Sequence, residues 1–130
     1  MSKETILLID DEKTVTDSLL NQLRTAFPMK YRYETAANTE EAMEIIDECY
    51  EDGETIELII SDWLMPKVKG HRFLMEVTKK YPDIKQIMLS GFADDESVEL
   101  AKEEANLKAF IKKPWEEEEL IETVKKVLGE

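Results

Sequence analysis

Four short apolar segments constrain the fold of this chain more than any other feature. Residues 6–9, 58–60 and 109–111 are continuously apolar, and residues 84–89 are apolar except for Lys85 and Gln86. Charged or hydroxyl side chains follow each segment within two positions. Continuous apolar runs of this length are typical of strands buried on both faces of a parallel sheet. A fifth segment, Tyr31–Ala37, alternates more loosely with polar residues and is interpreted as an edge strand.

Helical patterns separate these segments. The apolar stripes are Val15, Leu19, Leu23 and Phe27; Ala42, Ile45, Ile46 and Cys49 in a capped helix that opens at Thr39; Phe73, Leu74 and Val77; Val98, Ala101 and Ala105; and Leu120, Ile121, Val124, Val127 and Leu128. Strands that alternate with amphipathic helices predict a parallel sheet with helices on both faces. We therefore expect one α/β domain over residues 1–130.

Composition narrows the function and the location. With 42% hydrophobic and 36% charged residues, the chain has a globular rather than a disordered composition. Its 30 acidic and 17 basic residues give a net charge of -13, so we expect no direct binding of nucleic acid. The lone Cys49 cannot form an internal disulfide. Because no signal peptide opens the chain and no apolar run approaches roughly 20 residues, we expect a cytoplasmic protein without membrane contact.

Polar side chains are expected to meet where the predicted strands end. Ligands of parallel sheets bind at the carboxyl ends of the strands. The side chains gathered there are Asp10, Asp11, Asp62, Ser90, Lys112 and Lys113. Three carboxylates in one pocket repel one another, and a divalent cation removes this conflict. Oxygen ligands favour a hard ion, so two carboxylates, a backbone carbonyl and waters would suit Mg²⁺.

A carboxylate in such a pocket can accept a phosphoryl group. The reaction needs a metal and a second cation, because the phosphoryl oxygens carry negative charge. Lys113 is favoured over Lys112 as this cation because it precedes Pro114, and strand alternation sends the two lysines in opposite directions. The Ser90 hydroxyl can donate to another phosphoryl oxygen.

Simpler interpretations of the same residues stay open. Asp10 and Asp11 could cap the first helix, since aspartate at a helix start satisfies free backbone N–H groups. Asp62 could be a turn residue, and Ser90-Gly91 alone is an ordinary turn sequence.

These residues together resemble the receiver domains of two-component response regulators. The matching segments are Ile9-Asp10-Asp11, Asp62-Trp63-Leu64-Met65-Pro66 continuing to Gly70, Ser90-Gly91 and Lys113-Pro114. They occur in the family's order, each at the matching strand end, and the similarity extends over essentially the whole chain. The resemblance implies a flavodoxin-like, doubly wound, five-stranded parallel sheet in the order 2-1-3-4-5.

The resemblance also implies residue roles at the strand ends. Asp62 would accept the phosphoryl group from a phosphohistidine on a histidine kinase or a histidine phosphotransfer protein. Asp11, Asp62 and the Leu64 carbonyl would bind Mg²⁺ directly, and Asp10 would bind it mainly through water. Lys113 would bind the phosphoryl oxygens, and the Lys113-Pro114 peptide bond would be cis, a minority state among X-Pro bonds.

A conformational switch would follow phosphorylation. The resemblance implies that Ser90 moves toward the phosphoryl group and that Phe110 rotates into the space that Ser90 leaves. This movement would change the surface formed by the helix at 98–105, the strand at 109–111 and the helix at 120–128. Because Phe110 stands where many family members have tyrosine, no ring hydroxyl can take part.

We therefore expect a phosphorylation-activated signalling switch rather than an enzyme, acting on an output domain or target protein. A phosphorylation-dependent homodimer stays open, as does a receiver-like scaffold that binds without phosphorylation. A phosphatase of the haloacid dehalogenase type would need a second aspartate two residues after the nucleophile, and neither Asp10 nor Asp62 has one. A nucleotide- or flavin-binding protein would need a glycine-rich loop after a strand, and the sequence has none.

Overall fold

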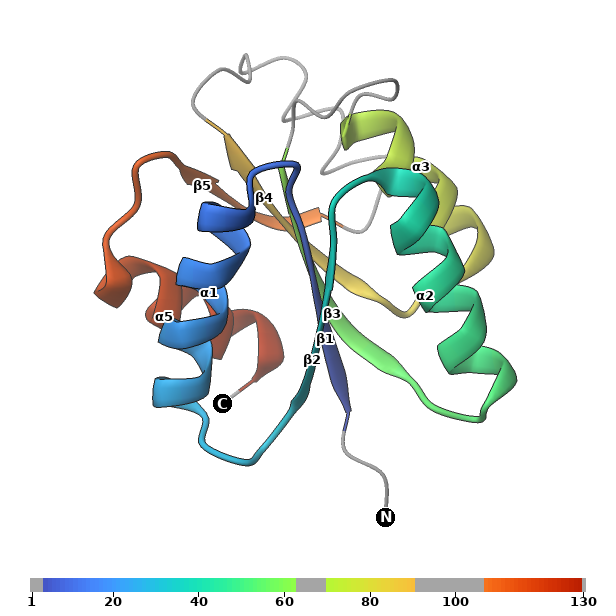
Figure 1. The fold of residues 1–130 in the computed structure, drawn as a ribbon, viewed down its shortest axis with the longest axis horizontal. Helices are drawn as coiled ribbons and strands as arrows, with labels where there is room; N and C mark the ends of the chain where they lie inside the picture. The colour runs from blue at the N-terminus through green and yellow to red at the C-terminus, as the bar shows by residue number, and fades with distance from the viewer. Residues whose placement is uncertain (1–3, 63–69, 91–106, 130) are drawn as a thin grey trace.

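A sheet of five parallel strands organises the fold (Figure 1). The computed structural model describes residues 4–62, 70–90 and 107–129. The strands are β1 (Thr5–Ile9), β2 (Arg32–Ala36), β3 (Ile56–Asp62), β4 (Lys85–Ser90) and β5 (Leu107–Lys112). Their order is β2-β1-β3-β4-β5, and every neighbouring pair is parallel. The structure thus confirms the predicted sheet, its strand order and the position of the 31–37 segment at an edge.

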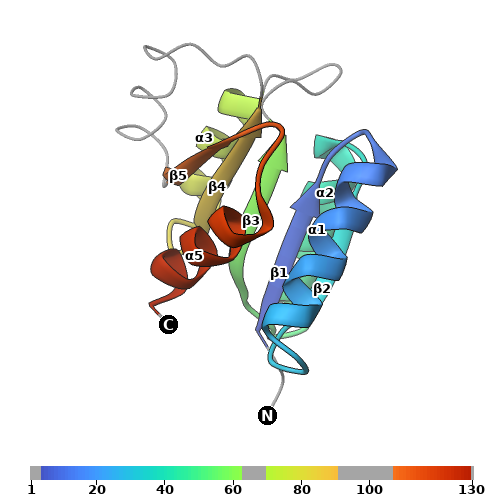
Figure 2. The ribbon, with the colours of Figure 1, turned by 90° about the vertical axis from the view of Figure 1, so that its left-hand side faces the viewer.

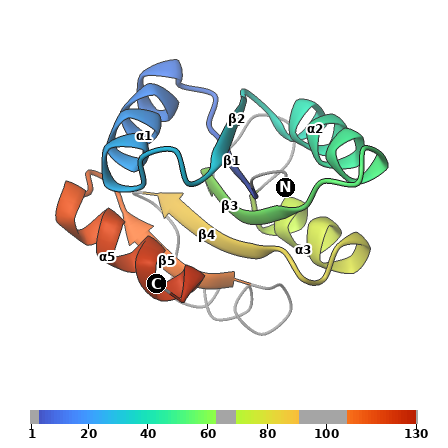
Figure 3. The ribbon, with the colours of Figure 1, turned by 90° about the horizontal axis from the view of Figure 1, so that it is seen from below.

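Helices cover both faces of this sheet. They are α1 (Lys13–Ala26), α2 (Thr39–Glu51), α3 (Gly70–Lys80) and α5 (Glu117–Leu128). α1 and α5 lie side by side on one face, and α2 and α3 lie on the other (Figure 2 and Figure 3). This arrangement confirms the predicted doubly wound architecture. The helix expected around Val98–Ala105 lies outside the described residues. None of the helices in the described ranges is long and apolar enough to cross a bilayer.

The two faces of the sheet bury separate apolar clusters. Ile6 and Leu8 of β1 pack with α1 and α5, whereas Leu7 and Ile9 pack with α2 and α3. All four side chains are at most 1% exposed. Full burial of each such side chain contributes about 1.5–3 kcal/mol to stability. Because both faces are covered, alternation between polar and apolar residues would bury polar groups, and this explains the continuous apolar runs.

A buried polar side chain lies within the strand β4. Gln86 of β4 is 0% exposed. Its Nε2 atom donates to the Leu74 carbonyl at 3.3 Å and to the Thr78 hydroxyl at 3.0 Å. Both partners belong to α3, so this amide joins the helix to the strand beneath it.

The start of α2 shows how a local hydrogen bond fixes a helix boundary. The helix begins at Thr39, as the sequence indicates, but Asn38 supplies the cap. The Asn38 Oδ1 atom accepts a hydrogen bond from the Glu41 N–H at 2.8 Å. At the other end, Gly53 adopts a left-handed conformation with φ 75°, which suits a residue without a Cβ atom. The predicted end at Glu51-Asp52-Gly53 is therefore confirmed.

Replacement of the cap tests this boundary. Asn38→Ala should lower the free energy of unfolding by about 1 kcal/mol, because the Glu41 N–H loses its side-chain acceptor. Asn21→Ala is the matched control, since Asn21 is exposed inside α1, where alanine has the higher helix propensity. Urea denaturation of both variants measures the difference. A loss in Asn21→Ala as large as that in Asn38→Ala would contradict the capping role.

Candidate functional site

The predicted site residues follow strands that end at the same edge of the sheet. β3 ends at Asp62 and β4 ends at Ser90, while Asp10 and Lys113 directly follow β1 and β5. The register keeps these ends level, because Ile9 pairs with Ser61, Asp62 with Leu89, and Ser90 with Lys112. The carboxyl ends of the strands gather at the top of Figure 1. The structure therefore brings these backbone positions together, as predicted. The side chains of Asp62 and Ser90, and all of Leu64, lie outside the described part of the chain.

Asp10 is the buried anchor of this edge. The residue is 2% exposed, and both of its carboxylate oxygens accept hydrogen bonds. Oδ1 accepts from the Glu12 N–H at 2.9 Å, and Oδ2 accepts from Lys113 Nζ at 2.9 Å. The Asp10 N–H donates to the Ala36 carbonyl at 3.1 Å, which fixes the backbone against the end of β2. Asp10 is therefore held through both its backbone and its side chain.

The ion pair between Asp10 and Lys113 crosses the carboxyl edge of the sheet. Its partners follow β1 and β5, and β3 and β4 lie between these strands. The contact therefore passes over the strand end that carries Asp62. The Asp10 side chain is 1% exposed and that of Lys113 is 21% exposed. A carboxylate buried to this degree is costly without a cation, so the ammonium group offsets a desolvation penalty of several kcal/mol.

Three neighbouring acidic side chains form a candidate metal site. Carboxylate oxygens of Asp10, Asp11 and Glu12 all lie within 4.8 Å of one another. Asp10 is buried, whereas Asp11 and Glu12 are exposed, so one side of the group is open to solvent. This set of oxygen donors fits a hard cation such as Mg²⁺ that keeps several waters. Glu12 was not among the predicted ligands, although its place as the third acid after β1 could have indicated it.

The helix-capping alternative for the aspartates holds only in part, because Asp10 satisfies one free backbone N–H before α1 but neither aspartate occupies the N-cap position. Glu12 occupies the N-cap position of α1, and its side chain makes no capping hydrogen bond. The Asp10 carboxylate accepts instead from the Glu12 N–H, which precedes the helix. Asp11 is exposed. Neither aspartate is therefore the N-cap of α1.

The segment after β5 agrees with several predictions. Lys113, rather than Lys112, reaches the acidic edge, and Lys112 is exposed. The Lys113-Pro114 peptide bond is cis, as the resemblance implied.

The two aromatic residues of this region are both half-buried. Trp115 donates from its Nε1 atom to Gln22 Oε1 of α1 at 2.9 Å. Phe110 is half-buried against the cluster beneath α2 and α3. Its rotation stays a prediction.

Comparison with known proteins places the chain in a family. The profile of the response regulator receiver domain matches residues 6–125. The chain therefore belongs to the family of response regulator receiver domains. Members of this family are signalling domains of two-component systems and not canonical enzymes. The family assignment agrees with the strand order and with the acidic and basic residues at the strand ends.

Individual relatives show the same similarity. The chain is 31% identical over 124 residues to the hydrogenase transcriptional regulatory protein HoxA of Cupriavidus necator, which is 95% of this chain and 24% of HoxA. It is 34% identical to the sensor kinase CckA of Brucella abortus, again over 95% of this chain but over 12% of CckA. The chain thus spans a quarter or less of these curated relatives. A CheY-like receiver domain protein of Methanospirillum hungatei superimposes with a TM-score of 0.83 at 29% identity, covering 98% of this chain and 95% of that structure.

The ion pair can be tested through stability. Lys113→Met should lower the free energy of unfolding at neutral pH by about 2 kcal/mol or more, because the buried Asp10 carboxylate loses its cation. Lys112→Met, one position away and exposed, should change it by less than about 0.5 kcal/mol. Urea denaturation without divalent cations measures both. Equal stability of the two variants would show that the ion pair does not stabilise the fold.

Proposed function

We propose that residues 1–130 form one receiver domain that is switched by phosphorylation of Asp62. The observation that carries this proposal is the 2.9 Å contact between Lys113 Nζ and Asp10 Oδ2. It places a cation and a buried carboxylate across the edge where β3 ends at Asp62. Neither a turn nor a passive scaffold needs a charged pair there. The phosphorylation-independent alternative is therefore not favoured.

The acidic residues would hold Mg²⁺ beside the acceptor. Asp11 and Asp62, with the Leu64 carbonyl, are the proposed direct ligands, and Asp10 acts mainly through water. The grouping of Asp10, Asp11 and Glu12 oxygens within 4.8 Å supports a cation on this side of the edge. When bound, the ion neutralises charge on the phosphoryl oxygens. The exposed carboxylates of Asp11 and Glu12 leave this side accessible from solvent.

In the proposed phosphotransfer step, Asp62 is the nucleophile and the other site residues bind the phosphoryl group and neutralise its charge. A carboxylate oxygen of Asp62 forms a bond to phosphorus while the P–N bond of a phosphohistidine breaks, and the electron pair returns to the imidazole. Lys113 binds a phosphoryl oxygen and compensates its charge, and the Ser90 hydroxyl donates to another. Lys113 already lies at the acidic edge before the phosphoryl group arrives. This position supports the proposed role of Lys113 in binding a phosphoryl oxygen.

The output of the switch is proposed to run through β5. Ser90 moves toward the phosphoryl group, and Phe110 turns into the space that it leaves. Phe110 is half-buried at the edge of an apolar cluster, so a change in its rotamer alters packing rather than hydrogen bonds. The surface of β5 and α5 changes as a result.

The partners follow from the same chemistry. The proposed phosphoryl donor is a histidine kinase or a histidine phosphotransfer protein, and the proposed target is an output domain or a separate protein. HoxA carries the name of a transcriptional regulator and CckA that of a sensor kinase, and this chain resembles part of each. Burial raises the pKa of the half-buried Cys49 thiol, so this side chain is a poor nucleophile. The proposed location is the cytoplasm, where such a thiol stays reduced.

Covalent phosphorylation is the direct test. Incubation with acetyl phosphate and Mg²⁺ should add one phosphoryl group, detected by intact-mass measurement. Asp62→Asn should abolish the addition, because it removes the nucleophilic oxygen. Asp11→Asn should slow it, because it removes a metal ligand. Asp83→Asn is the matched control, since Asp83 is exposed before β4, at the opposite edge of the sheet, and should react like the wild type.

Two results would contradict the proposal. Undiminished addition in Asp62→Asn would place the acceptor elsewhere, and peptide mass mapping would then locate it. An absence of any addition to the wild-type chain, with Mg²⁺ present and the fold intact, would favour the scaffold that binds without phosphorylation.

A further inference from the structure

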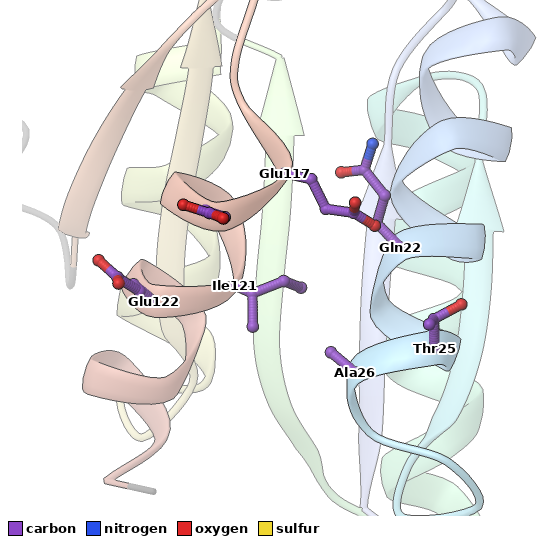
Figure 4. A pocket seen from close by; sticks show the side chains of 7 residues that line it. Gln22, Thr25, Ala26, Glu117, Ile121 and Glu122 are labelled. Carbon is purple, nitrogen blue, oxygen red and sulfur yellow. The ribbon is translucent and has the colours of Figure 1, made fainter.

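A groove lies between α1 and α5, on the side of the domain away from α2 and α3 (Figure 4). Its volume is about 350 Å³, enough for one or two side chains of a partner. The residues that matter for its chemistry are Gln22 and Ala26 of α1 and Glu117, Glu118, Ile121 and Glu122 of α5. None of them belongs to the strand-end site described above.

The floor of the groove is apolar. Ile121 and Ala26 are half-buried, and Figure 4 shows them facing each other from the two helices. They adjoin the buried cluster that contains Leu23 and Leu120. An apolar side chain placed between them would lose water on both sides, and the burial of its surface favours binding.

The rim of the groove is acidic. Glu117, Glu118 and Glu122 are exposed carboxylates, and the other lining residues are uncharged. Acidic residues in the first turn of α5 also interact favourably with the helix dipole, but Glu122 lies beyond that turn. The basic residues of α5, Lys125 and Lys126, follow in its last turn and do not line the groove. The groove therefore combines an apolar floor with a negative potential.

We propose that this α1–α5 groove binds a short, basic, amphipathic segment of another protein. One apolar side chain of the segment rests on Ile121 and Ala26, and its lysine or arginine side chains lie beside the glutamates of the rim. A second copy of this chain fits poorly, because a domain of net charge -13 would bring acidic residues against acidic residues. The proposal is independent of phosphorylation at Asp62, so its test uses the unphosphorylated protein.

A hydrogen bond gives the groove a natural reporter. Gln22 lines the groove, and its Oε1 atom accepts from the indole N–H of Trp115 at 2.9 Å. A ligand that displaces or reorients Gln22 changes the environment of this N–H. NMR of isotope-labelled protein resolves indole N–H signals from backbone signals, so binding in the groove is distinguished from binding elsewhere.

The probe is a helical peptide of leucine and lysine, about 15 residues long, with a single apolar stripe. Titration should shift the Trp115 indole signal and the Gln22 side-chain amide signals. A peptide with glutamate in place of lysine should leave both unchanged. The double variant Glu118→Gln, Glu122→Gln should weaken binding roughly fivefold, because two ion pairs at the rim are lost.

The matched control is the double variant Glu44→Gln, Glu48→Gln. These glutamates are also exposed and four residues apart, but they lie on α2, and the change in net charge is the same. Binding should weaken less than about twofold in this control. Equal losses in the two double variants would show non-specific attraction to an acidic domain and would overturn the proposal. So would shifts that map away from Gln22 and Ile121, or a wild-type dimer in sedimentation that buries this groove.

Discussion

A parallel strand in the middle of a sheet has its backbone groups paired on both sides, so its side chains must be covered by helices above and below. In this chain β1 meets that requirement with Ile6 and Leu8 under one pair of helices and Leu7 and Ile9 under the other. β1 carries no charged side chain between Thr5 and Ile9, and charge returns at Asp10, directly after the strand ends. The position of the acidic and basic groups at the carboxyl edge therefore follows from how the sheet is buried.

The parts of the fold that could be predicted are those in which local sequence and burial agree. The apolar runs located the buried strands, because both faces of the sheet are covered. Apolar residues that recur about every four positions located the helices. Asn38 rather than Thr39 caps α2, because either residue type can cap and only the backbone geometry decides between them. The hydrogen bonds of Gln86 could not be predicted, since its partners come from α3 and no local pattern indicates them.

The site was predictable in position but not in its contacts. The positions of Asp10 and Lys113 could be predicted because both residues directly follow predicted strands. Their contact joins residues 103 positions apart and depends on the sheet order, which came from the family resemblance and not from spacing. The two acidic regions of the domain also differ in physical character. The buried Asp10 carboxylate is stabilised by a cation within the domain. The exposed glutamates of the α1–α5 groove are stabilised by water and stay available for the cation of a partner.

Asp10 is more deeply buried than Lys113, so the order in which the two residues are replaced during evolution affects stability. If asparagine replaces Asp10 first, an amide oxygen still accepts from the Glu12 N–H, and the partly exposed ammonium of Lys113 can turn toward water. If Lys113 is lost first, a buried carboxylate remains without its cation. Lineages that abandon this chemistry should therefore pass through a neutral residue at position 10 before the lysine disappears, and chains with the lysine alone should outnumber those with the aspartate alone.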